Sequence, residues 1–241
     1  MLQTYLLLSL IIFSAGFVQG LSGFGSILLA LPILSLFIDI KILIPLMVLC
    51  GCSMSIFLLI QLRIHLDLKK IIPLFLGAIP GIPLGVLFLK KINPVLIYWI
   101  LGLILIGYSL YMLFFKSQNR GVNEKWGYGF GFLSGFIGGG LSAGGPPVIV
   151  YTSLQDWKKD IIKVTLQGFF VVSGLITIIV HALSGLTTSL VIRYYLISIP
   201  MLLVGTYLGS HFYEKISEES YKRLLLALLA ALGGFMIYRA V

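Results

Sequence analysis

The amino-acid sequence predicts an all-α polytopic membrane protein. Of its 241 residues, 59% are hydrophobic and only 10% are charged, whereas a soluble domain carries about 25% charged residues. The charges gather in short clusters between apolar runs that approach the ~20 residues an α-helix needs to cross a bilayer core. A mean hydropathy of +1.08 agrees with this fold class.

The basic character of the chain fits the same class. The net charge of +9 arises from 17 lysines and arginines against 8 acidic residues. In a soluble protein this would suggest nucleic acid, but here the basic residues lie between apolar runs, as the positive-inside rule expects. We therefore expect the lipid bilayer as a partner, no nucleic acid and no cofactor. The first run, 2–18, lacks a basic leader and a small-residue cleavage site, so we expect a retained span rather than a signal peptide.

The expected elements divide the chain into two halves. The first half, 1–115, begins with a glycine-interrupted apolar segment and continues with three spans, and the second half, 127–241, has the same plan after a polar linker. The expected segments are 2–38 (interrupted), 42–62, 71–89, 95–115, 116–126 (linker), 127–154 (interrupted), 161–183, 190–213 and 222–240.

Similar residues recur in the same order in the two halves, which indicates a duplication. Two of the matches, Gly81/Gly85 and Gly205/Gly209, have the GxxxG spacing that lets two helices approach closely. We therefore expect two homologous repeats. The other matches are Gly16-Phe17 with Gly135-Phe136, Gly20 with Gly139, Leu21-Ser22 with Leu141-Ser142, Gly25 with Gly145, and Lys91-Ile92 with Lys215-Ile216.

The interrupted segment of the second half contains three consecutive glycines, Gly138–Gly140, followed by Pro146 and Pro147. Each glycine costs a helix interior about 1 kcal/mol relative to Ala, and prolines fit the first turn of a new helix. We expect a helix that stops within the membrane, a turn of bare backbone at the glycines, and a second helix that begins at the prolines. Such backbone is tolerated at membrane depth only where protein buries it or water bathes it, so the break suggests a binding site.

Two topologies follow from what the interrupted segments do. If each crosses the membrane once, there are eight spans and the two repeats run in the same direction. The loop Lys and Arg residues then divide almost evenly between the two faces of the membrane. If each is a re-entrant hairpin, the repeats are inverted, and all but five of these residues lie on one face. We favour inverted repeats, because the positive-inside rule expects this asymmetry and because 127–154 is too short for two crossings. The five residues on the other face would be Lys41, Lys90, Lys91, Arg193 and Arg239.

Inverted repeats with discontinuous helices typically hold a substrate near the membrane midplane. Helix N-termini offer unpaired N–H groups and a partial positive charge, and glycines let the backbone approach a ligand. No Asp or Glu lies in the middle of a span, so we expect a small anion rather than a cation as the substrate. The candidate binding residues are Gln19, Gly20, Ser22, Gly23, Gly25, Ser26, Gly138, Gly139, Gly140, Ser142, Gly144, Gly145 and Gln167.

Three further residues belong to the candidate chemistry. His181 lies well inside an apolar run, so it is a candidate proton or anion partner. Cys50 and Cys52, two positions apart on a helix, point to different faces, so we expect neither a metal site nor a disulfide. No catalytic pair is evident, and we expect a protein that is not an enzyme.

The two glycine-containing segments carry a resemblance to a known family. Gly16-Phe-Val-Gln-Gly-Leu-Ser-Gly-Phe-Gly25 and Gly135-Phe-Ile-Gly-Gly-Gly-Leu-Ser-Ala-Gly-Gly-Pro-Pro147, in a duplicated chain of this length, resemble the sulfite exporter TauE/SafE family, also called toluenesulfonate uptake permeases. The likeness covers essentially the whole chain. It implies movement of sulfite, sulfonates such as sulfoacetate, or related anions, mostly across bacterial inner membranes. Gln19 and Phe24 make the first segment poorer in glycine than the family's richer versions, which suggests a shifted substrate.

We therefore expect a secondary transporter for a small sulfur-containing anion. Export is favoured, because the membrane potential alone drives anions outward by about 2.3 kcal/mol per charge per 100 mV. The alternatives are a passive anion channel, an importer of thiosulfate or an organic anion coupled to protons through His181, an assembly subunit without transport, and an intramembrane thiol relay that uses Cys50 or Cys52. The sequence leaves the oligomeric state open.

Overall fold

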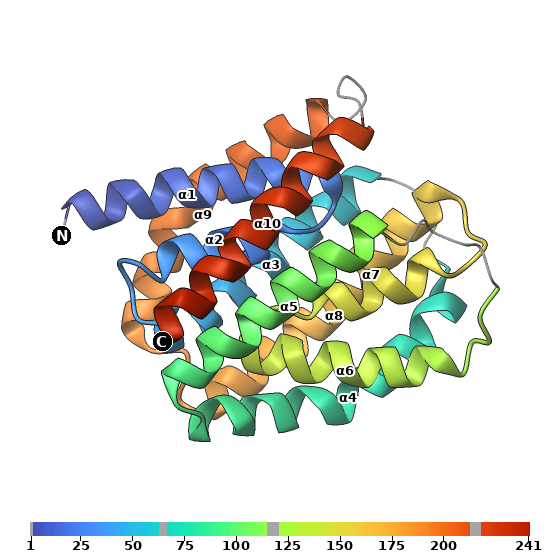
Figure 1. Ribbon diagram of the computed structural model, residues 1–241, viewed down its shortest axis with the longest axis horizontal. Coiled ribbons are helices and arrows are strands. Elements are labelled where there is room, and N and C mark those ends of the chain that lie inside the picture. Colours follow the sequence, from blue (N-terminus) through green and yellow to red (C-terminus); the bar gives the residue numbers. More distant parts are fainter. Residues whose placement is uncertain (1, 63–66, 115–120, 213–217) are drawn as a thin grey trace.

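The computed structural model describes residues 2–62, 67–114, 121–212 and 218–241, in which all regular secondary structure is α-helical (Figure 1). The all-α fold class is therefore confirmed. Residues 116–120 of the linker expected at 116–126, with Lys116 and Arg120, lie outside the described residues, as do Arg63 and Lys215. The described helices are α1 (Leu2–Ser22), α2 (Ser26–Leu34), α3 (Ile40–Leu62), α4 (Leu68–Lys91), α5 (Pro94–Phe114), α6 (Trp126–Leu141), α7 (Gly145–Ser153), α8 (Lys159–Leu183), α9 (Ser189–Phe212) and α10 (Glu218–Ala240).

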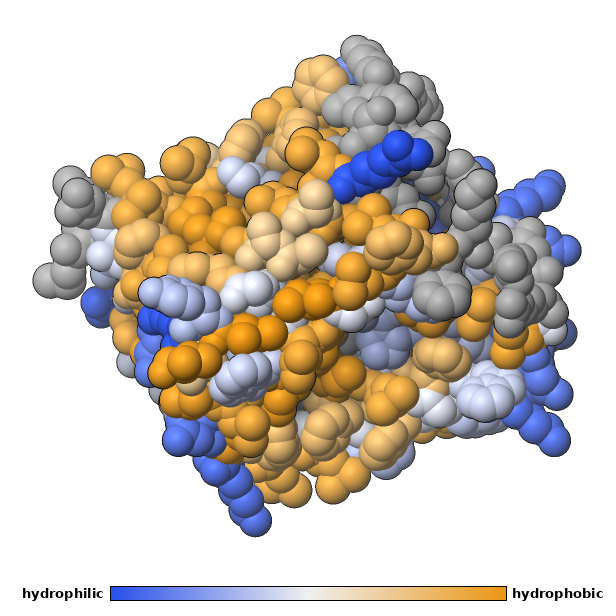
Figure 2. All heavy atoms as spheres, in the orientation of Figure 1, coloured by the Kyte–Doolittle hydropathy of each residue, from blue (hydrophilic) through white to orange (hydrophobic). Residues whose placement is uncertain are grey.

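Within the described residues, seven helices are long and apolar enough to cross a membrane, namely α1, α3, α4, α5, α8, α9 and α10. The helix α6 has 16 residues, and α2 and α7 have 9 each. Figure 2 shows a broad apolar surface between hydrophilic residues that gather at opposite ends of the visible face. A surface of this kind suits contact with lipid, and the chain is a multi-pass membrane protein.

The helices α6 and α7 form a hairpin. Beside the turn, Ser134 Oγ donates to the Gly144 carbonyl at 2.5 Å. Farther from the turn, the rings of Phe130 and Tyr151 lie 5.7 Å apart, and α7 runs back along α6. The two ends of the second interrupted segment therefore lie on the same side of the molecule.

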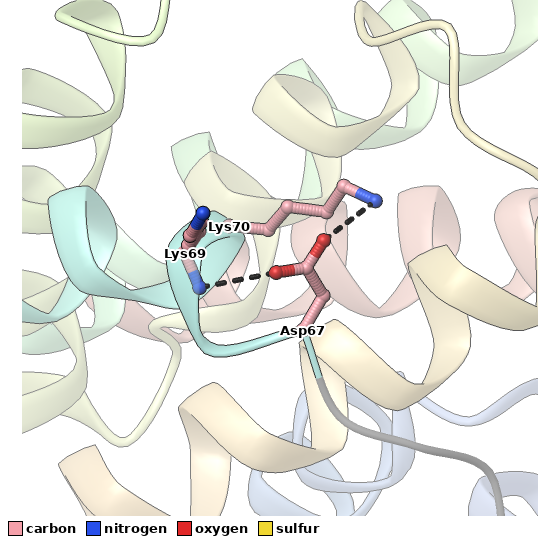
Figure 3. A network of polar contacts seen from close by, with 3 residues as sticks. All are labelled: Asp67, Lys69 and Lys70. Carbon is pink, nitrogen blue, oxygen red and sulfur yellow. Dashed lines mark hydrogen bonds and ion pairs between the residues drawn. The ribbon is translucent and has the colours of Figure 1, made fainter.

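Asp67, Lys69 and Lys70 form a polar cluster that caps the start of α4 (Figure 3). Asp67 Oδ1 accepts from the Lys69 N–H at 3.2 Å, and its Oδ2 lies 3.1 Å from Lys70 Nζ. The Lys70 ammonium also lies 5.2 Å from the ring centre of Trp157, which follows α7. An N-cap of this type stabilises a helix by about 1 kcal/mol, and the cation–π contact joins the end of α7 to α4.

The helix α2 likewise runs back beside α1 (Figure 1). Ser35, directly after α2, accepts hydrogen bonds from the Arg239 guanidinium at the end of α10. The same guanidinium lies 4.9 Å from the ring centre of Tyr98 at the start of α5. Because α4 and α5 are consecutive antiparallel helices, their starts lie at opposite ends of the molecule. The α1–α2 and α6–α7 hairpins therefore open toward opposite ends.

Interlocking glycines pack each hairpin along a span from the other half of the chain. A Cβ at Gly81 or Gly85 of α4 would collide with the backbone of α6, which runs parallel to α4. In the same way, a Cβ at Gly205 or Gly209 of α9 would collide with the backbone of the parallel helix α1. The prediction that both GxxxG pairs serve close helix packing is confirmed.

The remaining spans complete the bundle between these pairs. The helices α5 and α10 are antiparallel, because Gly102 lies against Gly233 and Ile237, while Gly233 lies against Ile106. The helices α3 and α8 pack together at Cys52 and Gly174. This places the middle of α3 and α8 beside the turns of both hairpins.

Candidate functional site

Both interrupted helices break at residues with positive φ. After α1, Gly23 and Gly25 have φ of 77° and 89°, and after α6, Ser142 has a φ of 56°. Glycine adopts this left-handed conformation readily, whereas a residue with a Cβ does so at a cost of about 1–2 kcal/mol. Gly23 directly follows the end of α1, as Ser142 directly follows the end of α6.

The glycine run in the second segment is helical, so the prediction that it forms the turn is wrong. A Cβ at Gly139 would lie 2.5 Å from the Ile82 carbonyl oxygen, and a Cβ at Gly140 would lie 2.8 Å from that of Gly85. These two positions require glycine because α6 lies so close to α4 that a side chain has no room. The turn consists of residues 142–144 instead. Gly20 is in the same position in α1, where a Cβ would collide with the backbone of α9.

A cavity of about 100 Å³ lies between the two breaks. Most of its wall comes from the start of α2, the turn before α7, and the middle of α3 and α8, and residues of α1, α4 and α6 complete it. Seven candidate residues line it: Gln19, Gly25, Ser26, Gly138, Ser142, Gly144 and Gly145. The other candidates lie outside this wall, namely Gly20, Ser22, Gly23, Gly139, Gly140, Gln167 and His181.

The cavity also has polar lining residues that the sequence did not single out, namely Ser55, Ser134, Ser173 and Thr177, and it is lined by Cys52, which the sequence offered only for a thiol relay. The pairs Cys52/Ser55 and Ser173/Thr177 are spaced three and four residues apart, which places each pair on one helix face. That spacing is the signal from which they could have been found. The apolar part of the wall includes Phe24, Ile27, Ile82, Ile149, Phe169 and Phe170, and none of the described lining residues carries a charge.

The start of α2 supplies backbone hydrogen-bond donors to this cavity. The N–H groups of Ser26, Ile27 and Leu28 precede the first intrahelical bond, which runs from Leu29 N to the Gly25 carbonyl at 3.1 Å, so they have no partner within the helix. All three residues line the cavity. At the start of α7, two prolines without N–H groups leave fewer donors. The α2 N-terminus is therefore the better-equipped anion-binding end.

Two glutamines hold the first break. The Nε2 groups of Gln19 and Gln167 donate to the Gly23 carbonyl at 3.2 and 2.7 Å. Gln19 Oε1 in turn accepts from Ser26 Oγ at 2.7 Å. Gln167 belongs to α8 and is fully buried, so it ties the first break to the second half. Ser22 acts within its own turn, where its Oγ donates to the Val18 carbonyl at 2.8 Å.

The second break is held from α3 and α8. Ser142 Oγ donates to the Ile44 carbonyl in α3 at 2.6 Å. His181 Nε2, in α8, lies 2.8 Å from the Gly139 carbonyl oxygen. Because a carbonyl only accepts, Nε2 carries the proton and Nδ1 is an acceptor. Nδ1 is buried and has no hydrogen-bond partner among the described groups.

The two cysteines are free thiols, and of the two only Cys52 lines the cavity. Its Sγ lies 3.9 Å from the Val171 carbonyl oxygen of α8. Across the described ranges of the chain, no group of three or more His, Cys, Asp or Glu side chains could hold a metal ion.

Comparison with known proteins identifies the family to which this chain belongs. A protein of Cupriavidus necator, named a probable sulfite/organosulfonate exporter TauE, is 24% identical over 184 residues, which cover 73% of this chain and 71% of that protein. No solved structure matches the chain significantly. The family model for the sulfite exporter TauE/SafE matches residues 8–236. Because this match spans nearly the whole sequence, the chain belongs to the sulfite exporter TauE/SafE family.

Proposed function

We propose that this protein is a secondary transporter that exports a small sulfur-containing anion, sulfite or an organosulfonate, through the cavity between the two breaks. The observation that carries the proposal is the uncharged cavity that is lined by the first turn of α2, including Ser26, and by Ser142 of the second break. Unpaired N–H groups at a helix N-terminus favour an anion by charge and by geometry. The family membership supports the same class of substrate.

The two parts of the cavity wall suggest how the substrate lies. The anionic head group binds the N–H groups at the start of α2, because Pro146 and Pro147 reduce the donors at α7. The apolar wall, which includes Phe169 and Phe170, accommodates the carbon skeleton of an organosulfonate. Gln19, Gln167 and His181 hold the breaks in place rather than contact the anion directly.

We propose that the two halves are inverted repeats. The opposite openings of the two hairpins support this, as does the antiparallel packing of α5 and α10 at Gly102 and Gly233. In such a fold, rocking of the hairpins exposes the central site alternately to each face. The face with most basic residues is then the cytoplasmic one. Gly20 contributes to this fold by letting α1 pack closely against α9, and Gly139 and Gly140 by letting α6 pack closely against α4.

Export needs only the membrane potential, which favours outward movement of an anion by about 2.3 kcal/mol per charge per 100 mV. A second mode, proton-coupled uptake, is favoured by one observation: the buried His181 Nδ1 is an acceptor without a described partner. A proton taken up there would alter the contact with the Gly139 carbonyl at the second break. The two modes differ in whether a pH gradient alone drives movement.

Reconstituted proteoliposomes test the proposal. Radiolabelled sulfite, thiosulfate, sulfoacetate and taurine are offered under imposed voltage and pH gradients. Saturable movement of a sulfur anion that follows voltage, and accumulates against its own gradient, is expected. Conductance without saturation would establish a channel instead. No anion movement by well-folded wild-type protein would overturn transport altogether and favour an assembly subunit.

A further inference from the structure

We propose that the central cavity takes a singly charged sulfur oxyanion that itself carries a hydrogen-bond donor, such as hydrogensulfite, and rejects dianions such as sulfite and thiosulfate. This inference rests on the proposed transport function and specifies the charge state of its substrate. The direction of the hydrogen bonds made by the hydroxyl groups of the cavity wall carries it.

Hydroxyl groups that line the cavity donate their protons to carbonyl groups of the protein. In α8, Ser173 Oγ donates to the Phe169 carbonyl at 2.7 Å, and Thr177 Oγ1 donates to the Ser173 carbonyl at 2.8 Å. A carbonyl oxygen only accepts, so each of these hydroxyl groups keeps only its lone pairs for a ligand. Two further hydroxyl groups of the wall donate to carbonyl groups in the same way, those of Ser134 and Ser142.

The hydroxyl group of Ser26, at the start of α2, is also used within the protein. Gln19 Nε2 donates to the Gly23 carbonyl, so the other end of this amide is its oxygen, which accepts from Ser26 Oγ at 2.7 Å. Ser26 therefore offers an anion its backbone N–H and not its hydroxyl proton. Ser55, the remaining hydroxyl residue of the wall, is buried and donates to no described group, so its hydroxyl group can turn toward a ligand.

The donors for an anion therefore come mainly from the backbone at the start of α2. A helix N-terminus carries a partial charge of about half an elementary charge, and none of the described lining residues is charged. The cost of taking an ion out of water rises with the square of its charge, so this wall compensates one negative charge much better than two. The hydroxyl oxygens of the wall also require a donor on the substrate. Hydrogensulfite supplies that donor with its acidic proton, which the sulfite dianion lacks.

The pH dependence of transport by the wild type in proteoliposomes tests the charge state. Hydrogensulfite loses its proton near neutral pH, whereas 2-hydroxyethanesulfonate keeps one negative charge and a hydroxyl donor throughout. Above the pKa of hydrogensulfite, the KM for total sulfite is expected to rise about tenfold per pH unit, while that for 2-hydroxyethanesulfonate stays within about twofold. Titratable groups of the protein near the cavity act on both substrates, so the ratio of the two KM values reports the charge of the substrate. These groups are Cys52, Tyr108, Lys163 with its electrostatic partner Asp160, and His181.

Removal of two hydroxyl groups from α8 tests the acceptor side of the cavity. The wild-type KM for 2-hydroxyethanesulfonate is expected to be about fivefold lower than that for ethanesulfonate, as for one neutral hydrogen bond. The double variant Ser173→Ala/Thr177→Val is expected to lose this preference, because the acceptor oxygens are gone. The matched control is Ser198→Ala/Thr206→Val, which is expected to keep the preference. Its two hydroxyl groups are buried in α9, donate to carbonyl groups one turn earlier at 2.7 Å each, and do not line the cavity.

The outcomes separate this inference from the proposed function. If the wild type transports, and its KM for total sulfite follows that for 2-hydroxyethanesulfonate at every pH, selection of a single charge is wrong. Transport of thiosulfate as efficient as that of hydrogensulfite overturns it as well. A folded α8 double variant that keeps the preference for 2-hydroxyethanesulfonate overturns the acceptor role of its hydroxyl groups, and both wild-type comparisons remain decisive if that variant does not fold. Absence of sulfur-anion transport by the wild type overturns both proposals.

Discussion

The side-chain amide of Gln167 donates to the Gly23 carbonyl at 2.7 Å, across 144 positions of the sequence. The same carbonyl accepts from Gln19 of its own hairpin. The first break is thus fastened both to the helix it interrupts and to α8 of the other half. Any displacement of α8 therefore acts directly on the backbone donors at the start of α2.

Replacing Gln167 by Leu tests this fastening. The Gly23 carbonyl then keeps a single donor, and the free energy of unfolding is expected to fall by about 1–2 kcal/mol. Transport is expected to fall further than stability, because the N-terminus of α2 is no longer positioned. Thermal unfolding in detergent and flux in proteoliposomes measure the two effects. Gln61→Leu, at an exposed glutamine near the end of α3, serves as the control, and equal behaviour of the two variants would refute the prediction.

Substitution of the interlocking glycines tests the close helix packing between the two halves of the chain. Gly85→Ala places a methyl group against the backbone of Phe136 in α6, so α4 and α6 must move apart. We expect a loss of about 1–3 kcal/mol in the free energy of unfolding. Gly129→Ala, in α6 where a Cβ would meet nothing within 4 Å, is the matched control and is expected to be neutral. A melting temperature that is equal for both variants would contradict close packing at Gly85.

Two changes at Ser142 separate backbone strain from hydrogen bonding. Both Ser142→Ala and Ser142→Gly remove the hydroxyl donor to the Ile44 carbonyl, which is worth about 1 kcal/mol. Only the glycine variant also relieves the left-handed conformation at φ 56°, by about 1 kcal/mol. We therefore expect the glycine variant to be the more stable of the two, and both to bind substrate more weakly. Denaturation measures the stability of the two variants, and titration measures their affinity for substrate. An alanine variant more stable than the glycine variant would exclude strain at this position.

His181 admits a test that distinguishes a structural from a proton-carrying role. Glutamine retains a donor near the place of Nε2 but takes up no proton, so His181→Gln is expected to keep voltage-driven export. His181→Leu leaves the Gly139 carbonyl oxygen without this donor and is expected to lose about 1–3 kcal/mol of stability. Flux is measured under voltage and under pH gradients separately. Selective loss of pH-driven uptake in His181→Gln would establish the proton-coupled mode in place of potential-driven export.

Cys52 reports on the cavity through its thiol. In a Cys50→Ala background, a maleimide is expected to block transport, and bound substrate is expected to slow the reaction. The double variant Cys50→Ala/Cys52→Ala should transport like wild type and resist the reagent, which makes it the control. Complete loss of flux in the double variant would instead favour the thiol relay.

The sequence was sufficient for the features that depend on local chemistry. Run lengths and sparse charge predict the all-α membrane class, and the GxxxG pairs predict close helix packing. The sequence does not show that Gly138–Gly140 is helical, because the reason for two of these glycines lies in another helix: α4 leaves no room for a side chain at Gly139 and Gly140.

The residues around the site depend even more on tertiary contacts. Nothing local marks Phe169 or Phe170 as part of a cavity wall, since their neighbours in that wall come from α2, α3 and the turn before α7. The division into repeats at 116–126, and the direct contact of each candidate residue with substrate, remain predictions.

The close packing of α1 with α9 and of α6 with α4 through their glycines has a consequence for biogenesis. Because α1 is synthesised well before α9, the small-residue surface of α1 stays exposed to lipid until α9 has also been inserted. Neither half can reach its final packing alone, because the hairpin of each half packs against a span of the other half. Separately expressed halves should therefore be degraded or aggregate, and regain order only when both are synthesised in the same membrane.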